Sequence, residues 1–140
     1  MEQEELTGKI IGCAMTVHTA LGAGFLESVY QNALKYELRK AGLRVDSERP
    51  IIVYYDSLPV GVFEADLLVE GCIIIELKAV QAFSAAHEVQ LVNYLTATGI
   101  EIGLLLNFGT TKLEFKRKHR IFRKREMPAQ SDQNREDDQD

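Results

Sequence analysis

Six polar residues interrupt otherwise apolar segments, and their types suit metal-dependent hydrolysis. They are Glu27, Asp66, Glu76, Lys78, Gln90 and Tyr94. Asp66 lies in the apolar stretch 65–69, and Glu76 directly follows three isoleucines. Burying a carboxylate is costly unless a cation or hydrogen bonds compensate the charge. Two carboxylates brought together would repel each other, and a divalent cation would remove that repulsion.

The choice of metal and the place of the lysine follow from ligand type and strand geometry. Oxygen ligands favour Mg²⁺ or Mn²⁺ over zinc. Asp66 and Glu76 are the candidate metal ligands, and the carbonyl of Leu77 is a further candidate. Glu76 and Lys78 are two residues apart, so on a strand their side chains emerge on the same face. The Lys78 ammonium could then orient or deprotonate a water molecule and offset charge on a phosphate. Taken alone, a Glu-x-Lys pair is more typical of a solvated strand end.

The periodicity of apolar residues predicts the elements that position these side chains. Steps of three and four residues predict helices over about residues 4–21 and 26–41, and Ser84 is placed to cap a third helix that runs to about residue 98. Short apolar or alternating runs bounded by turn residues predict strands at 50–55, 58–69, 72–78, 101–106 and 112–116.

The order of these elements predicts the fold class. Two helices, three strands, a helix and a further strand indicate an α/β domain with a mixed sheet of four to five strands flanked by helices. The first three strands would form an antiparallel meander, and the third helix allows the fourth strand to pair in parallel. We expect a single domain over residues 1–125. The acidic segment 126–140 contains too little apolar surface to order itself and is expected to be a disordered tail.

The shared metal site places a condition on the turn between the second and third strands. A two-residue turn at Glu70-Gly71 would pair Val69 with Cys72 and put Asp66 and Glu76 on opposite faces of the sheet. We therefore predict a three-residue loop or a bulge that places Asp66 opposite Glu76.

Composition excludes several other classes of protein. Apolar content of 46% and charged content of 26% are ordinary for a globular chain. No run approaches the roughly 18 apolar residues of a membrane helix, and the acidic start is not typical of a secretory signal. Cys13 and Cys72 lack metal-ligand spacing and cannot hold a four-cysteine cluster. A cytoplasmic protein is the simplest interpretation.

Basic residues gather near the end of the chain although the net charge is −5. The segment 112–125 holds eight of the sixteen Lys and Arg residues. One interpretation is a strip that binds the phosphates of nucleic acid, and the other is a solvated end partly neutralised by the acidic tail. The candidate phosphate-binding residues are Lys116, Arg117, Lys118, Arg120, Arg123, Lys124 and Arg125.

Taken jointly, the motifs resemble a known family. The segment Gly24-Phe25-Leu26-Glu27-Ser28-Val29-Tyr30 is similar to the signature of the GxxExxY proteins, a bacterial and archaeal branch of the PD-(D/E)XK nuclease superfamily. The resemblance covers about residues 5–115 and continues through segments 65–69, 75–79, 87–95 and 103–109. It implies a restriction-endonuclease-like αβββαβ core with an extra N-terminal helix.

The resemblance also implies roles for the candidate residues. Asp66 and Glu76 would bind the metal, and Lys78 would be the catalytic lysine. Glu27 would be an additional metal ligand, directly or through water. Gln90 and Tyr94 match the Gln-x-x-x-Tyr motif of the RecB-like nucleases, so they would shape the site or hold the substrate. The usual proline before the Asp is absent, and Ala65 stands there.

Three functions therefore stand at this stage. The first is a divalent-metal-dependent nuclease, with DNA as the expected substrate and RNA left open. The second is a catalytically silent nucleic-acid-binding accessory subunit. The third is a partner protein that forms a homo-oligomer through its apolar first helix. For His87 and His18 a surface or structural role is favoured over metal binding, and for Tyr30 core packing and catalysis are both open.

Overall fold

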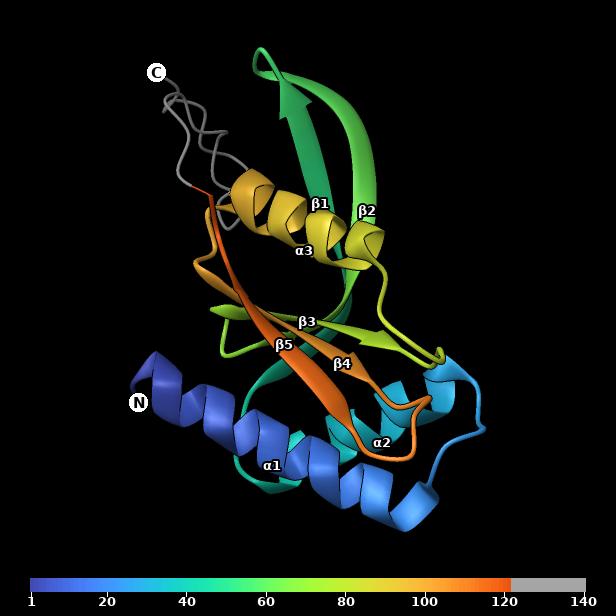
Figure 1. The fold of residues 1–140 in the computed structure, drawn as a ribbon. Helices are drawn as coiled ribbons and strands as arrows, with labels where there is room; N and C mark the ends of the chain where they lie inside the picture. The colour runs from blue at the N-terminus through green and yellow to red at the C-terminus, as the bar shows by residue number, and fades with distance from the viewer. Residues whose placement is uncertain (122–140) are drawn as a thin grey trace.

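The computed structural model describes residues 1–121, and its centre is a five-stranded sheet with the order β1-β2-β3-β4-β5. Helices α1 (Gln3–Leu21) and α2 (Glu27–Lys40) lie on one face of this sheet, and α3 (Ala85–Thr98) lies on the other (Figure 1). The strands are β1 (Val45–Tyr55), β2 (Leu58–Val69), β3 (Ile73–Lys78), β4 (Ile102–Asn107) and β5 (Glu114–His119).

The pairing of the strands confirms the predicted topology. Strands β1, β2 and β3 form an antiparallel meander, β3 and β4 pair in parallel across the α3 crossover, and β5 pairs antiparallel with β4. The expected α/β class, with a mixed sheet between helices and an additional N-terminal helix, is therefore confirmed.

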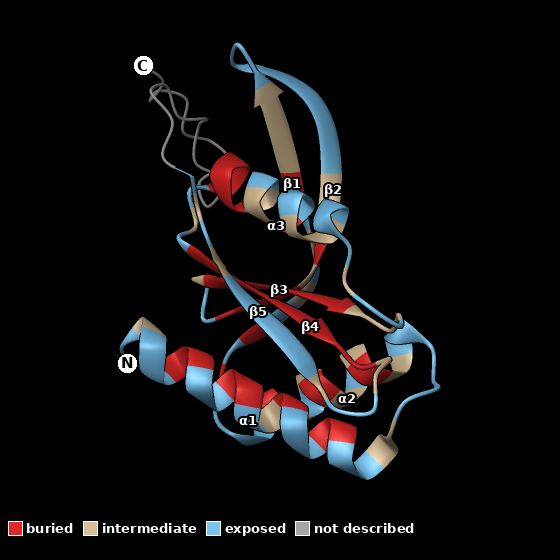
Figure 2. Cartoon of the chain, in the orientation of Figure 1, coloured by how far each residue is buried: buried red, intermediate tan, exposed pale blue. Residues whose placement is uncertain are grey.

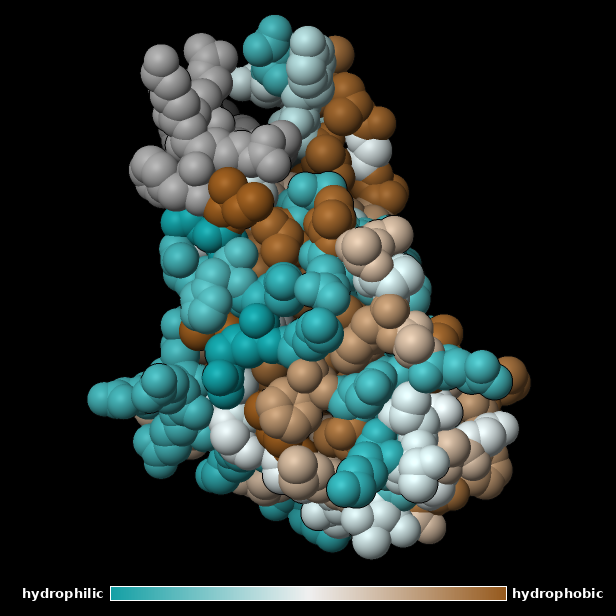
Figure 3. Space-filling view, in the orientation of Figure 1, coloured by the Kyte–Doolittle hydropathy of each residue, from teal (hydrophilic) through white to brown (hydrophobic). Residues whose placement is uncertain are grey.

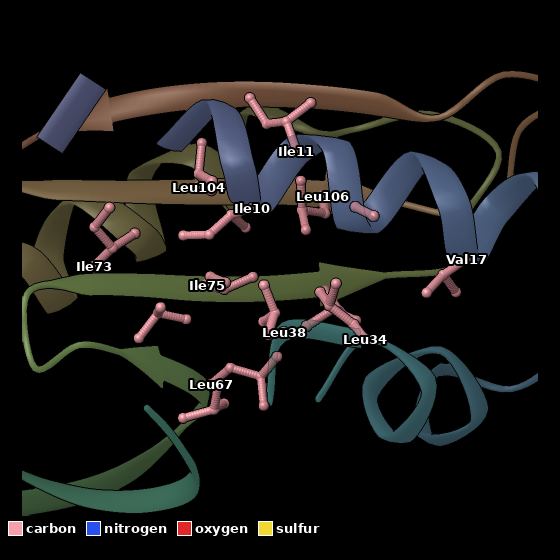
Figure 4. Close-up of a cluster of buried hydrophobic side chains, with 14 of the residues drawn as sticks. Ile10, Ile11, Val17, Leu34, Leu38, Leu67, Ile73, Ile75, Leu104 and Leu106 are labelled. Carbon is pink, nitrogen blue, oxygen red and sulfur yellow. The ribbon is translucent and has the colours of Figure 1, made fainter. Parts of the chain in front are cut away.

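Two apolar cores fix the sheet from both sides. The larger core joins α1 and α2 to the sheet, and Figure 4 shows Ile10, Leu34 and Ile75 among its members. The smaller core joins α3 to the other face through residues that include Ile74 and Leu91. Because neighbouring strand residues point to opposite faces, the isoleucine run of β3 fills both cores. Figure 2 shows the buried sides of α1 turned towards the sheet.

The apolar stripe of α1 is part of the larger core, and this corrects one expectation. Ile10, Ala14 and Val17 are buried within the chain itself, so α1 does not offer them as an oligomer interface. Exposed apolar side chains gather instead on the β1–β2 hairpin, where it extends beyond α3 (Figure 3). They include Val60 and Val62.

Two strands differ by more than one residue from their predicted bounds, because backbone pairing and not side-chain pattern sets their ends. Strand β1 begins at Val45 and not at residue 50, since its polar first half pairs with residues 65–69 of β2. Strand β5 runs over Glu114–His119 and not over 112–116. It is an edge strand with little burial, so its sequence carries almost no alternation.

The turn between β2 and β3 has the length that a shared carboxylate site requires. Val69 pairs with Ile73, which leaves residues 70–72 as a three-residue loop. Glu70 and Gly71 take positive φ values of 53° and 67°. The same register pairs Leu67 with Ile75, so Asp66 and Glu76 come next to each other across the two strands. The prediction of a three-residue loop is confirmed.

No helix within residues 1–121 is long and apolar enough to cross a membrane. Arg123, Lys124, Arg125 and the tail expected at 126–140 lie outside the described residues.

The loop after β4 lies directly against the backbone that follows β3. A Cβ atom at Gly109 would stand 2.4 Å from the carbonyl oxygen of Val80 and 2.5 Å from its nitrogen. Asn107 joins the same two segments: its Oδ1 accepts from the N–H groups of Val80 (3.0 Å) and Gly109 (2.9 Å), and its Nδ2 donates to the Val80 carbonyl (2.9 Å). The backbone that follows Lys78 is therefore fixed by these contacts to Asn107 and Gly109.

We expect Gly109→Ala to lower the free energy of unfolding by about 1–3 kcal/mol or more, because the new methyl group would meet backbone atoms that cannot move aside. Gly8→Ala is the matched control, since a Cβ at this position of α1 meets nothing within 4 Å. It should stabilise the helix by about 0.5–1 kcal/mol. Urea denaturation followed by circular dichroism measures both, and equal effects would contradict the close approach.

Candidate active site

The strands β2 and β3 part at Asp66, and side chains take over the backbone hydrogen bonds there. The Leu77 N–H donates to Asp66 Oδ2 at 2.8 Å, and the Asp66 N–H donates to Glu76 Oε2 at 3.3 Å. Each carboxylate thus binds the backbone beside the other. The two acidic groups converge as the turn register predicted.

Asp66 is also released from its other neighbour, β1. The register of β1 and β2 passes from the pair Ser47–Leu67 to the pair Arg49–Ala65, and Glu48 between them has a positive φ of 56°. The Asp66 carbonyl accepts instead from Gln31 Nε2 at 2.9 Å. Buried backbone groups need partners, so this amide permits the irregularity that aims Asp66 into the site.

Sequence reasoning missed Gln31, although a signal was present. Gln31 lies four residues after Glu27, hence on the same side of α2. Because Glu27 faces the site, the residue one helical turn later, Gln31, could have been expected to face the neighbouring strand β2, which carries Asp66.

Burial and mutual repulsion disfavour the charged forms of both acids. Burial first, and then the charge of Asp66, raise the pKa of Glu76 from 4.5 to about 8. Burial raises the pKa of Asp66 as well, and the charge of Glu27 adds to this rise, against the lowering effects of the Leu77 N–H and of Lys78. The positive charge near these two carboxylates is therefore too small to keep both of them ionised at their ordinary pKa values.

Three further predicted residues interact electrostatically with this pair from different elements. Lys78, at the end of β3, is the cation that lowers the pKa of both acids. Glu27 is the first residue of α2, is exposed, and acts on Asp66 through its charge. Tyr94 of α3 is half-buried and stacks on Phe63 with ring centroids 3.4 Å apart. Burial and the charges of Glu76 and Asp66 raise the pKa of Tyr94, which places its hydroxyl within their field.

Gln90 lies one turn before Tyr94 on α3 and is exposed. His87 is not drawn to the acids: its Nδ1 accepts from the Ser84 N–H at 3.2 Å, and its own N–H donates to Ser84 Oγ at 3.3 Å, which caps α3. His18 is buried and its Nε2 lies 2.9 Å from the Thr110 carbonyl oxygen. His18 thus has the structural role that the sequence favoured, and His87, expected only as a surface residue, also caps α3.

Tyr30 is a structural residue that fixes the entry into α2. Its ring is fully buried and stacks on Phe108 at 4.7 Å between centroids. Its hydroxyl donates to the Gly22 carbonyl at 2.5 Å and accepts from the Phe25 N–H at 3.1 Å. Core packing is therefore its role, and through it the loop before Glu27 is held in place.

The residues present fit a divalent cation that keeps water ligands. Asp66 and Glu76 supply two carboxylates, and the Leu77 carbonyl points to the same side of β3 as the N–H that binds Asp66. Within residues 1–121 no three Asp, Glu, His or Cys side chains lie close enough together to hold a metal ion. Glu27 therefore does not complete a direct three-residue ligand set. Few protein ligands and several waters are typical of Mg²⁺ sites.

Basic side chains in the described part of the segment 112–125 form ion pairs with acids on α3 and just after it. Lys116 and Lys118 of β5 both pair with Glu88 of α3, at 3.2 Å and 3.0 Å, and Arg120 pairs with Glu101. Arg117 is exposed on the alternate side of β5. Several of these charges thus have partners within the chain.

The fold and the facing acids define a class of protein, and comparison with known proteins agrees. The family model of the PD-(D/E)XK nuclease superfamily matches residues 4–118, so the chain belongs to this superfamily. Among solved structures, the crystal structure of SSO0001 is similar, with a TM-score of 0.52 and 19% identity. The match covers 69% of this chain and 52% of that one, so this chain spans about half of its length. No curated protein sequence matches the chain.

The raised pKa values predict how stability changes with pH in metal-free protein. The folded state keeps the Glu76 proton to about pH 8, whereas the unfolded state releases it near pH 4.5. The unfolded state therefore binds fewer protons between these values, and the free energy of unfolding falls as pH rises through this window. Glu76→Gln should flatten this dependence. Urea denaturation in EDTA between pH 5 and pH 8.5 measures it, and a wild type whose stability rises steadily with pH would contradict the raised pKa.

Proposed function

We propose that this protein is a divalent-metal-dependent nuclease that hydrolyses phosphodiester bonds in nucleic acid, with DNA as the expected substrate and Mg²⁺ or Mn²⁺ as the cofactor. The observation that carries the proposal is the pair of half-buried Asp66 and buried Glu76, whose pKa values are both raised, beside one lysine. Two acids held together in this way lower the free energy of unfolding. Acids with strongly shifted pKa values that cluster together are typical of active sites.

The geometry supports a role for each residue. Asp66, Glu76 and the Leu77 carbonyl would hold the metal ion, and Glu27 would reach it through water. When bound, the ion would supply a Lewis acid and an acidified water molecule. Lys78, on the same face as Glu76, would orient or deprotonate the attacking water and offset charge on the phosphate. Tyr94 would border the site with Gln90 and position the substrate.

Within the superfamily, we propose the GxxExxY group of the RecB-like branch. Gly24 takes a φ of 117° that favours glycine, Glu27 acts on Asp66, and Tyr30 fixes the loop between them. The signature therefore has a physical basis at each of its three positions. The free thiols of Cys13 and Cys72 suit a cytoplasmic protein.

The alternatives are less well supported. A catalytically silent nucleic-acid-binding subunit would be expected to have lost Asp66, Glu76 or Lys78, because the loss of any one of them would end catalysis. All three residues are present. Homo-oligomer formation would have to use a surface other than the apolar side of α1. Phosphate binding by Lys116, Arg117, Lys118 and Arg120, together with Arg123, Lys124 and Arg125, remains a proposal. The pairing of Lys116 and Lys118 with Glu88 lowers the charge they offer.

We expect Lys78→Ala to reduce cleavage by about 100-fold or more, because the group that acts on the water and the phosphate is lost. Lys9→Ala, an exposed lysine of α1, is the control and should cleave as the wild type does. The measurement is turnover on single-stranded, double-stranded and flapped DNA and on RNA, at matched Mg²⁺. Wild-type turnover by Lys78→Ala would count decisively against this role.

A metal that binds the folded state should raise the melting temperature of the wild type. Asp66→Ala and Glu76→Ala should remove most of this response. Above about pH 8, where Glu76 is also charged in the metal-free protein, both changes should raise metal-free stability because one repelling charge is gone. Glu27→Ala should weaken the response only partly, since its contact would run through water.

The control for this series is Glu5→Ala, an exposed acid of α1 that should leave the metal response intact. Melting curves with EDTA, Mg²⁺ and Mn²⁺ give all the comparisons. A wild type indifferent to both ions at millimolar concentration would sink the metal-site assignment.

A further inference from the structure

The residue at the N-cap of α2 is unsuited to its position. Leu26 takes the extended conformation of an N-cap (φ −70°, ψ 156°), yet α2 has no side-chain cap hydrogen bond. Ser, Thr, Asp and Asn are preferred there because their oxygen accepts from the first free N–H groups of a helix. Helix α3 follows the preference, with Ser84 bonded to the His87 N–H. Leu26 therefore forgoes stability that one polar atom would supply.

Leu26 is also highly exposed. Its relative exposure is 77%, the largest among the exposed apolar residues of the described chain. The preceding Phe25 is 49% exposed. Phe25 has a structural role, since its ring packs edge-on against Tyr30 at the position of a hydrophobic staple. No packing role of this kind accounts for Leu26.

Leu26 directly precedes Glu27, and a hydrogen bond fixes the backbone of Phe25 before it. Glu27, the next residue, acts on Asp66 through its charge, and Figure 1 shows the α1–α2 connection at the end of the sheet where β3 ends. The Tyr30 hydroxyl holds the Phe25 N–H and the Gly22 carbonyl. An exposed apolar surface held in place at a catalytic mouth is typical of a binding element and not of a loose loop.

The apolar character of this surface indicates what it binds. Contacts of Lys and Arg to phosphates contribute to the binding of duplex and of single-stranded DNA alike. The bases of a single strand also expose apolar faces, which can contact Leu26 and stack on the ring of Phe25, whereas neighbouring bases cover those faces in a duplex.

We propose that Leu26 and the exposed edge of Phe25 form a base-contacting ridge, which gives the site a preference for single-stranded nucleic acid. This inference rests on the proposed nuclease function, but the binding of nucleic acid to the ridge can be measured without cleavage. Phe63 of β2 and Tyr94 of α3, whose rings stack, offer a second aromatic surface. The strand would thus pass between the two helices with its phosphate at the acids.

The test is a substitution with opposite expected effects on stability and binding. Leu26→Ser supplies the missing cap oxygen in a conformation that already suits an N-cap, so the melting temperature should rise. The same change removes the apolar contact, so the affinity for single-stranded DNA should fall severalfold. A residue with only a structural role would change both in the same direction.

Binding is measured by fluorescence anisotropy in the Lys78→Ala background with Mg²⁺, on a labelled single-stranded oligonucleotide and on its blunt duplex. Phe25→Ala should weaken single-strand binding by about 5- to 100-fold, the range for loss of one stacked base, and duplex binding by much less. Tyr36→Ala is the control: Tyr36 is 62% exposed on the same helix, and nine residues after Glu27 it points to the opposite side. It should bind as the background protein does.

The outcomes separate this inference from the proposed function. Unchanged single-strand affinity in Leu26→Ser, or equal losses for single strand and duplex, overturns the ridge even if the wild type cleaves DNA. Single-strand binding that depends on Leu26, in a protein without metal-dependent cleavage, supports the ridge and refutes the nuclease. Absence of binding to either form overturns the ridge.

Discussion

The structure depends on one unfavourable interaction, the approach of a half-buried carboxylate and a buried one. Asp66 and Glu76 each accept a hydrogen bond from the backbone beside the other, and burial makes the charge of each costly. Side chains would relax away from such a contact if the backbone allowed it. The three-residue turn after β2 and the Gln31 amide leave no such freedom, because they fix the register and the carbonyl of Asp66.

The rest of the fold makes that constraint rigid. β3 is buried on both faces, so its end cannot shift without disturbing two cores. Beyond it, the Asn107 amide binds the backbone of Val80 on both its donor and acceptor atoms. Helix α2 supplies Glu27 from one face of the sheet, and α3 supplies Tyr94 from the other. Both faces therefore contribute residues to the surroundings of the acids.

Buried polar groups with complete hydrogen bonding hold the loops at this end of the sheet. Tyr30 fixes the connection into α2, and Asn107 fixes the loop after β4. Such networks are costly when a partner is lost, and they favour a single arrangement when all partners are present. The hydrogen bonds of Tyr30 also hold the segment before Leu26, where α2 has no side-chain cap.

The sequence by itself determined the element order and the fold class, because apolar periodicity is a local signal. Acids within apolar segments also led it to predict that Asp66 and Glu76 lie together, as they do. It also narrowed the turn after β2 to a three-residue loop or a bulge, since a two-residue turn would put Asp66 and Glu76 on opposite faces, and the structure decided for the loop. Tertiary structure alone decided the ends of β1 and β5, which follow from pairing with neighbours whose hydrogen bonds leave no side-chain pattern. It alone revealed Gln31, whose partner is a backbone carbonyl 35 residues away. It also decided that Lys116 and Lys118 share Glu88, because the distance between charges on different elements depends on how those elements pack.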